Sequence, residues 1–316
     1  MIDFRYHLVS LIAVFMAIAL GIIIGTTALN EPILADIQNQ VTALEQDKRS
    51  LEDRTQQLQA QVDSTDAFAE AVAPALVEGA LTGSGVLLVV TNEEVAPETV
   101  EATTALVEQA GGTVTGTIAL QPQYSDPSTS SSLQSYVTGP GLPTGVQLPE
   151  VDDAGQLVGA LLGQVLMVPS SGGPTPDASA ISSVLAGLRA LDVLTQESDS
   201  VTPADYAIVL TAGGFTGDDA AERNTVLVDL AAGLDAAGSG AVVAGDAASA
   251  GGNGLVGVIR ADPSLSADLS TVDNVTTSAG RISTVLALGA ESEGTSGAYG
   301  TGEDTQPVPP VPAATP

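Results

Sequence analysis

The sequence predicts a chain of three parts: a single N-terminal transmembrane helix, a coiled-coil stalk, and an α/β Rossmann-like domain with a mostly parallel sheet. Three observations favour this fold class. An apolar run dominates the first 30 residues, aliphatic residues then recur every seven positions, and short apolar runs later alternate with helical patterns. The first pattern is typical of a membrane span, the second of a coiled coil and the third of βαβ units.

Residues 1–30 are predicted to form a membrane anchor. The strongly apolar run covers residues 8–29, and as a helix its 22 residues extend about 33 Å, which matches a hydrocarbon core of about 30 Å. The alternative is a cleaved signal peptide. The apolar region of such a peptide is usually about 7–15 residues long and ends at an Ala-x-Ala-like site, which this run lacks. We therefore favour an uncleaved anchor.

Charges beside the span predict its orientation. Arg5 precedes the apolar run, whereas Glu31 and Asp36 follow it, so we expect a cytoplasmic N-terminus and an extracytoplasmic C-terminal domain. Inside the run, Gly21 and Gly25 form a G-x-x-x-G pair, which is typical of closely packed membrane helices. The alternative is that glycine is simply common in membrane helices.

Residues 33–63 are predicted to form the coiled-coil stalk. Four aliphatic residues lie at intervals of seven and fit d positions: Ile37, Leu44, Leu51 and Leu58. The corresponding a positions hold Leu34, Val41, Lys48, Thr55 and Val62. Polar residues at a positions set register or oligomer state at a cost in stability. This pattern favours self-association into a homo-oligomer over a single amphipathic helix that packs on its own domain.

Residues 83–290 are predicted to form the extracytoplasmic α/β domain. The expected strands are 85–90, 113–120, 207–211, 241–244 and a short edge strand at 270–272, and the expected helices are 97–110, 179–194, 218–237 and 278–290. Residues 121–153 are expected to be a loop. Residues 154–168 fit either a buried helix or a helix followed by a strand. Residues 291–316 lack aliphatic clusters and are expected to be a disordered tail.

Composition excludes several functions. The chain has 38 acidic and 8 basic residues, a formal net charge of −30 that repels nucleic acid. It has no cysteine, and its one histidine, His7, adjoins the membrane span, so a Ser-His-Asp triad in the exported domain is ruled out. The basic residues beyond the stalk are expected to form ordinary ion pairs: Arg189, Arg223, Arg260 and Arg281.

Residues 252–257 match the dinucleotide-binding pattern G-x-G-x-x-G. A chain with 34 glycines produces such a match readily by chance, and this one does not directly follow a strand. We therefore expect no nucleotide site, no other cofactor, no metal site and no enzymatic activity.

Two regions resemble the actinobacterial family named after the mycobacterial copper transport protein B. The opening FRYHLVSLIAVFMAIALGIIIGT is similar to the start of that family, and LSTVDNVTTSAGRISTVLALGAE (269–291) with GAYGTG (297–302) resembles its C-terminal signature. The resemblance implies a membrane-associated envelope protein linked to copper homeostasis or efflux, from a family described as an outer-membrane channel. It singles out Asp273, Asn274, Gly280 and Arg281 as candidate functional residues. The alternative is that these four residues form a turn, a helix cap and an ion pair.

These observations lead to a functional hypothesis. We expect a single-pass protein of the cell membrane that acts in copper homeostasis as an oligomeric scaffold or binding module, with copper as a partner by family resemblance only. The family description adds the outer membrane as an alternative location. The alternatives for function are a structural or regulatory envelope protein without a copper role, and a divalent-cation-dependent α/β enzyme.

Overall fold

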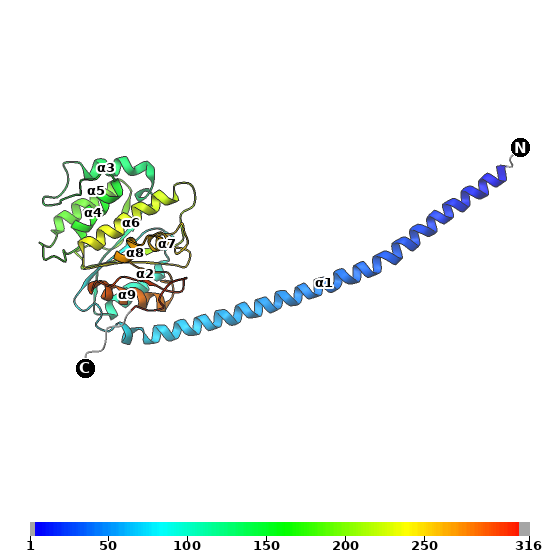
Figure 1. Cartoon of the computed structure of the whole chain (residues 1–316), viewed down its shortest axis with the longest axis horizontal. Coiled ribbons are helices and arrows are strands. Elements are labelled where there is room, and N and C mark those ends of the chain that lie inside the picture. The colour runs from blue at the N-terminus through cyan, green and yellow to red at the C-terminus, as the bar shows by residue number, and fades with distance from the viewer. Residues whose placement is uncertain (1–3, 310–316) are drawn as a thin grey trace. The chain divides into compact units, whose positions relative to one another are not determined.

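The computed structural model describes residues 4–309, without the side chains of residues 26–35. Two compact units are present, Met1–Thr65 and Asp66–Pro316. The first unit is helical wherever it is described, and α1 (Phe4–Val77) begins in it and ends in the second (Figure 1). Residues 4–25 of α1 form the one described helical stretch that is long and apolar enough to cross a membrane, with a mean hydropathy of 2.8. This confirms a single apolar N-terminal helix.

The last turns of α1 belong to the second unit. The sequence predicted that the helical stalk ends at residue 63, but α1 continues to Val77. Ala69, Ala73 and Val77 pack against the core of the domain. Because residues four apart lie on one face of a helix, this apolar stripe explains why the helix extends into the domain.

The second unit is built around a seven-stranded sheet with the order β3-β2-β1-β4-β5-β6-β7. All neighbouring strands are parallel except β2 and β3, which are antiparallel. The strands are β1 (Gly85–Val90), β2 (Thr113–Leu120), β3 (Leu194–Gln196), β4 (Tyr206–Thr211), β5 (Ala241–Gly245), β6 (Ser270–Val272) and β7 (Ala298–Tyr299). A mostly parallel mixed sheet with helices is therefore confirmed.

Helices cover both faces of this sheet (Figure 1). One face is covered by α2 (Pro97–Gln109), α9 (Ser278–Ser292) and the end of α1. Against the other face pack α3 (Ser130–Val137), α4 (Ala154–Leu166), α5 (Ala178–Ala190), α6 (Ala220–Ala237) and α7 (Leu255–Ala261). Successive residues of the central strands alternate between the two cores, as the period of a β-strand requires. Strands buried on both faces explain the continuous apolar runs in the sequence.

Glycines allow α4 and α6 to pack with their backbones in contact. A Cβ atom at Gly159 would lie 2.4 Å from the carbonyl oxygen of Asp229, and one at Gly163 would lie 2.1 Å from that of Gly233. Gly155, Gly159 and Gly163 recur every four residues and therefore lie along one face of α4. The structure thus identifies residues 154–166 as a helix, and the strand of the second predicted alternative is reduced to a single bridge residue, Met167, which pairs with Ala204.

Three local predictions were wrong. The helix expected at 179–194 ends at Ala190, because Asp192 adopts a left-handed conformation with φ of 56°, and the chain then enters β3. The segment expected to be a tail contains β7, which pairs with β6, so that β6 is not an edge strand. The loop expected at 121–153 contains α3 and two short 3-10 turns, η1 (Pro122–Tyr124) and η2 (Pro127–Thr129).

Candidate functional site at the carboxyl edge of the sheet

A small cavity lies where the strand order reverses. From β1, the chain moves to β2 on one side and returns to β4 on the other, and ligands of open α/β sheets bind outside the carboxyl ends of the strands at such a point. The cavity has a volume of about 90 Å³ and is lined by residues that follow β1, including Asn92 and Glu94, and by residues 211–215 at the end of β4.

Asn224 of α6 contributes an unpaired oxygen to this cavity. Its side chain is 1% exposed. The Nδ2 amide donates to the carbonyl oxygens of Ala220 (3.0 Å) and Asn253 (2.8 Å), which leaves Oδ1 without a hydrogen-bond partner. A buried acceptor without a partner is costly, so the cavity suits a water molecule or another small donor. Asn224 was not predicted from the sequence. The pattern that could have identified it is a polar residue at a position of the helix that otherwise holds buried apolar residues.

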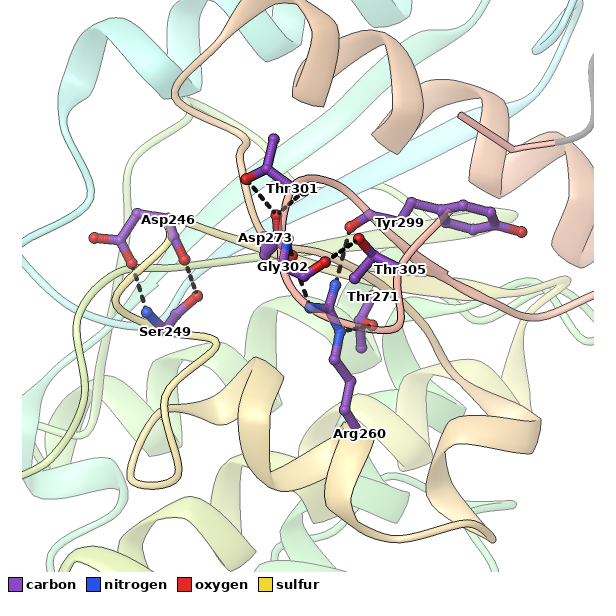
Figure 2. A network of polar contacts seen from close by, with 9 residues as sticks. All are labelled: Asp246, Ser249, Arg260, Thr271, Asp273, Tyr299, Thr301, Gly302 and Thr305. Carbon is purple, nitrogen blue, oxygen red and sulfur yellow. Dashed lines mark hydrogen bonds and ion pairs between the residues drawn. The ribbon is translucent and has the colours of Figure 1, made fainter. Parts of the chain in front are cut away.

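Next to the cavity, Asp246 fixes two loops. Its Oδ1 accepts hydrogen bonds from the backbone N–H groups of Gly213 (2.9 Å) and Ser249 (2.8 Å). The Ser249 hydroxyl in turn donates to the Asp246 carbonyl oxygen (Figure 2). Gly213 has a φ of 66°, a conformation that favours glycine. Asp246 therefore joins the loop after β4 to the loop after β5.

Asp273, a predicted candidate, lies at the centre of the polar network in Figure 2. It is 1% exposed and follows β6 directly. Its Oδ2 lies 2.7 Å from Nη1 of Arg260 and accepts the N–H of Gly302 at 3.0 Å, while its Oδ1 accepts the N–H of Thr301 at 2.8 Å. The carboxylate thus binds one guanidinium and two backbone amides. Of the four basic residues beyond the stalk, Arg260 forms the predicted ion pair.

Arg260 completes the network from α7. Its Nε donates to the Thr271 hydroxyl at 2.9 Å, and its Nη2 donates to the Tyr299 carbonyl oxygen at 2.9 Å. The guanidinium therefore connects α7 to β6 and β7, while Asp273 binds the loop after β7. Glycine is required at 300, because its φ is 131° and a Cβ atom there would lie 2.0 Å from Oδ1 of Asp273.

The network keeps Asp273 ionised. Burial alone raises the pKa of a carboxyl group, but the hydrogen bonds from Arg260, Thr301 and Gly302 outweigh burial and lower the pKa of Asp273 below its ordinary value. A carboxylate with this many donors has its lone pairs occupied. Its chemical role in this arrangement is to hold the loop after β7 on the sheet.

Of the other three predicted candidates, Asn274 lies in the turn before α9, and Gly280 and Arg281 lie in its first turn. Gly280 packs against Asn274, since a Cβ atom at 280 would lie 1.9 Å from the Asn274 carbonyl oxygen. Arg281 donates from Nη1 to the Thr276 carbonyl oxygen (2.9 Å) and from Nη2 to the Ser278 hydroxyl (2.9 Å). Asn274 is adjacent in sequence to Asp273, but its own Oδ1 is buried without a partner. The structure therefore brings Asn274 and Gly280 into contact and places Arg281 on the same turn, outside the Asp273 network.

Comparison with known proteins decides the family. The sequence matches the family model described as "Copper transport outer membrane protein, MctB" over residues 1–310. The chain belongs to this family. It is 33% identical over 312 residues to the "Copper transporter MctB" of Mycobacterium tuberculosis (strain ATCC 25618 / H37Rv), an alignment that covers 98% of this chain and 99% of the relative. A protein of the same name from Mycobacterium leprae (strain TN) is 34% identical over 309 residues, covering 96% of this chain and 97% of the relative.

In this member of the copper transport outer membrane protein family, the G-x-G-x-x-G motif is part of the packing between α7 and the loop before it. A Cβ atom at Gly254 would lie 2.2 Å from the Ser249 carbonyl oxygen, and one at Gly257 would lie 2.1 Å from the Gly251 carbonyl oxygen. Close packing accounts for both glycines. Among the described residues, no three histidine, cysteine or carboxylate side chains are grouped so that they could hold a metal ion.

The predicted helix-packing residues of this family member lie in the first unit. A Cβ atom at Gly21 or Gly25 would meet nothing within 4 Å in the single chain. The predicted seam residues Ile37, Val41, Leu44, Leu51 and Leu58 are all exposed on α1. The side chain of Leu34 lies outside the described residues.

Proposed function

We propose that this chain is a single-pass envelope protein that serves copper transport as an oligomeric scaffold or binding module. The names of its relatives and of its family support the link to copper transport, and one apolar N-terminal helix supports membrane attachment. The N-terminus lies in the cytoplasm, because Arg5 precedes the span, and the α/β domain lies outside the membrane. The chain acts on its cargo without chemical conversion and without a cofactor.

The proposal divides the chain into four parts. Residues 1–30 form the anchor, 33–63 the coiled-coil stalk, 83–290 the α/β body and 291–316 a C-terminal extension whose first part joins the sheet. The body is Rossmann-like in that helices cover both faces of a mostly parallel sheet and the strand order reverses between β1 and β4. Residues 64–82 connect the stalk to the body and carry the apolar stripe that packs on the domain.

One observation carries the proposal of self-association: a regular apolar stripe on α1 that the single chain leaves exposed. Leu44, Leu51 and Leu58 are 70%, 61% and 62% exposed, and Ile37 and Val41 are about half exposed. Fully burying one such side chain contributes about 1.5–3 kcal/mol. A second copy of the same helix offers the complementary stripe, because heptad positions interdigitate in a parallel pair. Gly21 and Gly25, where a Cβ atom would meet nothing within 4 Å in the single chain, form a separate proposed packing face within the membrane.

Two ion pairs within and beside this stripe, one of them made by Lys48 at an a position, stabilise the helix itself. Lys48 and Glu52 lie 3.4 Å apart and Arg49 and Glu45 lie 3.8 Å apart, each pair separated by one helical turn. Both pairs are well exposed, and each contributes only a few tenths of a kcal/mol. The helix is therefore maintained in part by local pairs, while association depends on the apolar seam.

Cysteine crosslinking in membranes tests the seam. The chain has no cysteine, so Leu44→Cys introduces a single thiol. Oxidation is expected to convert this variant to a covalent dimer. The matched control is Gln46→Cys, which lies at an f position on the opposite side of the helix and is expected to remain mostly monomeric. Equal crosslinking at both positions, or none at Leu44→Cys, contradicts the parallel seam.

A deletion strain tests the role in copper transport. We expect it to grow more poorly in elevated copper, and the wild-type chain to restore growth. The double variant Leu51→Glu and Leu58→Glu places charges in the seam and is expected to restore growth less well while reaching the membrane in equal amount. Unchanged copper tolerance of the deletion strain would remove the copper role and leave a structural envelope protein.

A further inference from the structure

A second cavity, of about 130 Å³, lies between η1, α3, α4 and α6. Its lining is acidic and includes Asp126, Asp153 and Glu222 together with the phenol of Tyr124. None of these residues belongs to the network around Asp273.

Two buried oxygens near this cavity have no hydrogen-bond partner. They are Oδ2 of Asp229 and the hydroxyl oxygen of Tyr124, whose side chain is 1% exposed and lines the cavity. A buried polar atom without a partner costs about 1–3 kcal/mol. Native proteins rarely retain two such atoms beside one cavity unless a bound group satisfies them.

Gly155 lies next to the acidic side chains of Asp153 and Asp229. A Cβ atom at Gly155 would lie 2.7 Å from Oδ2 of Asp229 and 3.1 Å from Oδ1 of Asp153. Both carboxylate oxygens therefore lie close to Gly155, and a side chain at this position would crowd them. Asp153 is held in position as the N-cap residue of α4, where its Oδ1 accepts the N–H of Gln156 at 3.0 Å.

Burial, followed by repulsion from the Asp153 carboxylate and a hydrogen bond between the two side chains, raises the pKa of Asp229 to about 6, and a bound cation would take the place of the shared proton. A basic side chain, Arg223, lies beside the same cavity and helps to lower the pKa of Asp126, after the hydrogen bonds from Ser128. Its guanidinium donates to the Ser125 hydroxyl and to the Pro122 carbonyl oxygen and lies over the Phe215 ring, 4.3 Å from its centroid.

We propose that this cavity binds a hard divalent cation of the Mg²⁺ and Ca²⁺ class through the carboxylates of Asp153 and Asp229 and the hydroxyl of Tyr124. Oxygen atoms are the ligands that these ions prefer, and both ions are commonly held by one or two carboxylates with water in the remaining positions. The cation satisfies both unpaired oxygens and removes the repulsion between the two carboxylates. Soft copper ions, which prefer sulfur and imidazole, do not fit this donor set.

Terbium luminescence tests the site directly. Tb³⁺ is an oxygen-seeking cation that emits when a neighbouring tyrosine absorbs light, and this chain has five tyrosines and no tryptophan. The full-length protein in detergent, excited at the tyrosine band, is expected to show saturable emission that Ca²⁺ displaces. Tyr124→Phe is expected to lose most of this emission, and Asp229→Asn to weaken Tb³⁺ binding by about tenfold or more.

Matched variants separate this site from the general acidity of the chain. Tyr136→Phe removes a different half-buried phenol, and Asp235→Asn removes a carboxylate at another cavity; both are expected to leave emission and affinity within about twofold of wild type. Gly155→Ala places a methyl group against the carboxylate oxygens of Asp153 and Asp229 and is expected to abolish Tb³⁺ binding. If the Gly155→Ala protein does not fold, the Tb³⁺ affinity of Asp229→Asn, which keeps the shape of the side chain, tests the proposal instead. Emission that survives in Tyr124→Phe and Asp229→Asn, or is lost equally in Asp235→Asn, overturns the proposal.

Discussion

Removal of the Asp273 carboxylate is the perturbation with the largest expected effect on the fold. Asp273→Ala leaves Nη1 of Arg260 and the N–H groups of Thr301 and Gly302 without their acceptor in a site where Asp273 is 1% exposed. Breaking a buried ion pair by removing one partner costs about 3–5 kcal/mol, because the remaining charge stays buried and uncompensated. We expect a loss of stability in this range.

The magnitude can be converted to a melting temperature. For a unit of roughly 150–250 residues, 1 kcal/mol changes the melting temperature by about 2–4 °C. The expected loss therefore lowers the melting temperature of the α/β unit by about 6–20 °C, as calorimetry of the full-length protein in detergent would measure. Hydrogen exchange gives a second measurement, since the amides of Thr301 and Gly302 are expected to lose protection first.

Two controls make this prediction specific. Glu303→Ala removes an exposed carboxylate from the same loop and is expected to change stability by less than about 0.5 kcal/mol. The double variant Arg260→Met and Asp273→Leu removes both charges and is expected to recover part of the loss, because no uncompensated charge remains. If Asp273→Ala unfolds within about 1 kcal/mol of wild type, the network does not hold the loop and the interpretation of Asp273 fails.

Two further predictions concern the packing of α4 and α6 and the cavity lined by Asp235, Asp268 and Glu291. A methyl group at 163 would overlap Gly233 in α6, whereas one at 289 in α9 would meet only an atom 3.9 Å away. In chemical unfolding, Gly163→Ala is therefore expected to destabilise the protein by about 1–3 kcal/mol, and Gly289→Ala to stabilise it by up to about 1 kcal/mol. Equal effects of the two substitutions would contradict the backbone contact between α4 and α6. Burial raises the pKa of Asp235 to about 6, so its ionisation disfavours the folded state as pH rises from about 4 to above 6. Asp235→Asn is therefore expected to be more stable than wild type by about 1–2 kcal/mol at pH 8, a value reduced for the solvent exposure of the cavity, and nearly equal to wild type at pH 3.5. A stability difference that is the same at both pH values would contradict the raised pKa of Asp235.

The parallel strands were predictable because their signal is local. Residues 85–90 and 113–120 fold as strands with the predicted bounds, since a strand buried on both faces appears in sequence as an apolar run between turn residues. β3 and β7 were not predictable in this way. They have three and two residues, and each forms a strand only because it pairs with an adjacent strand, β3 with β2 and β7 with β6. Their formation depends on contacts between segments distant in sequence.

The same distinction explains which candidate residues were found. The resemblance singled out Asp273, but Arg260, its partner, lies 13 residues earlier in a segment with no signal of its own beyond a positive charge. Asn224 and Tyr124 each carry an unpaired buried atom, and such a property exists only once the surrounding elements are placed. A sequence can therefore indicate residue types suited to a site, while unsatisfied hydrogen bonds become visible only in the folded chain.

The two C-terminal stretches that resemble the family, 269–291 and 297–302, are held together by Asp273 and Arg260. The Thr271 N–H donates to the Gly297 carbonyl oxygen and the Asp273 N–H to that of Tyr299, so the second stretch pairs along the strand that begins the first. A carboxylate that already binds a guanidinium and two backbone amides has little capacity left for a metal ion. The chemistry of Asp273 therefore favours a positioning role, and any ligand of the carboxyl edge has to be sought beside it, at the cavity where Asn224 keeps an unpaired oxygen.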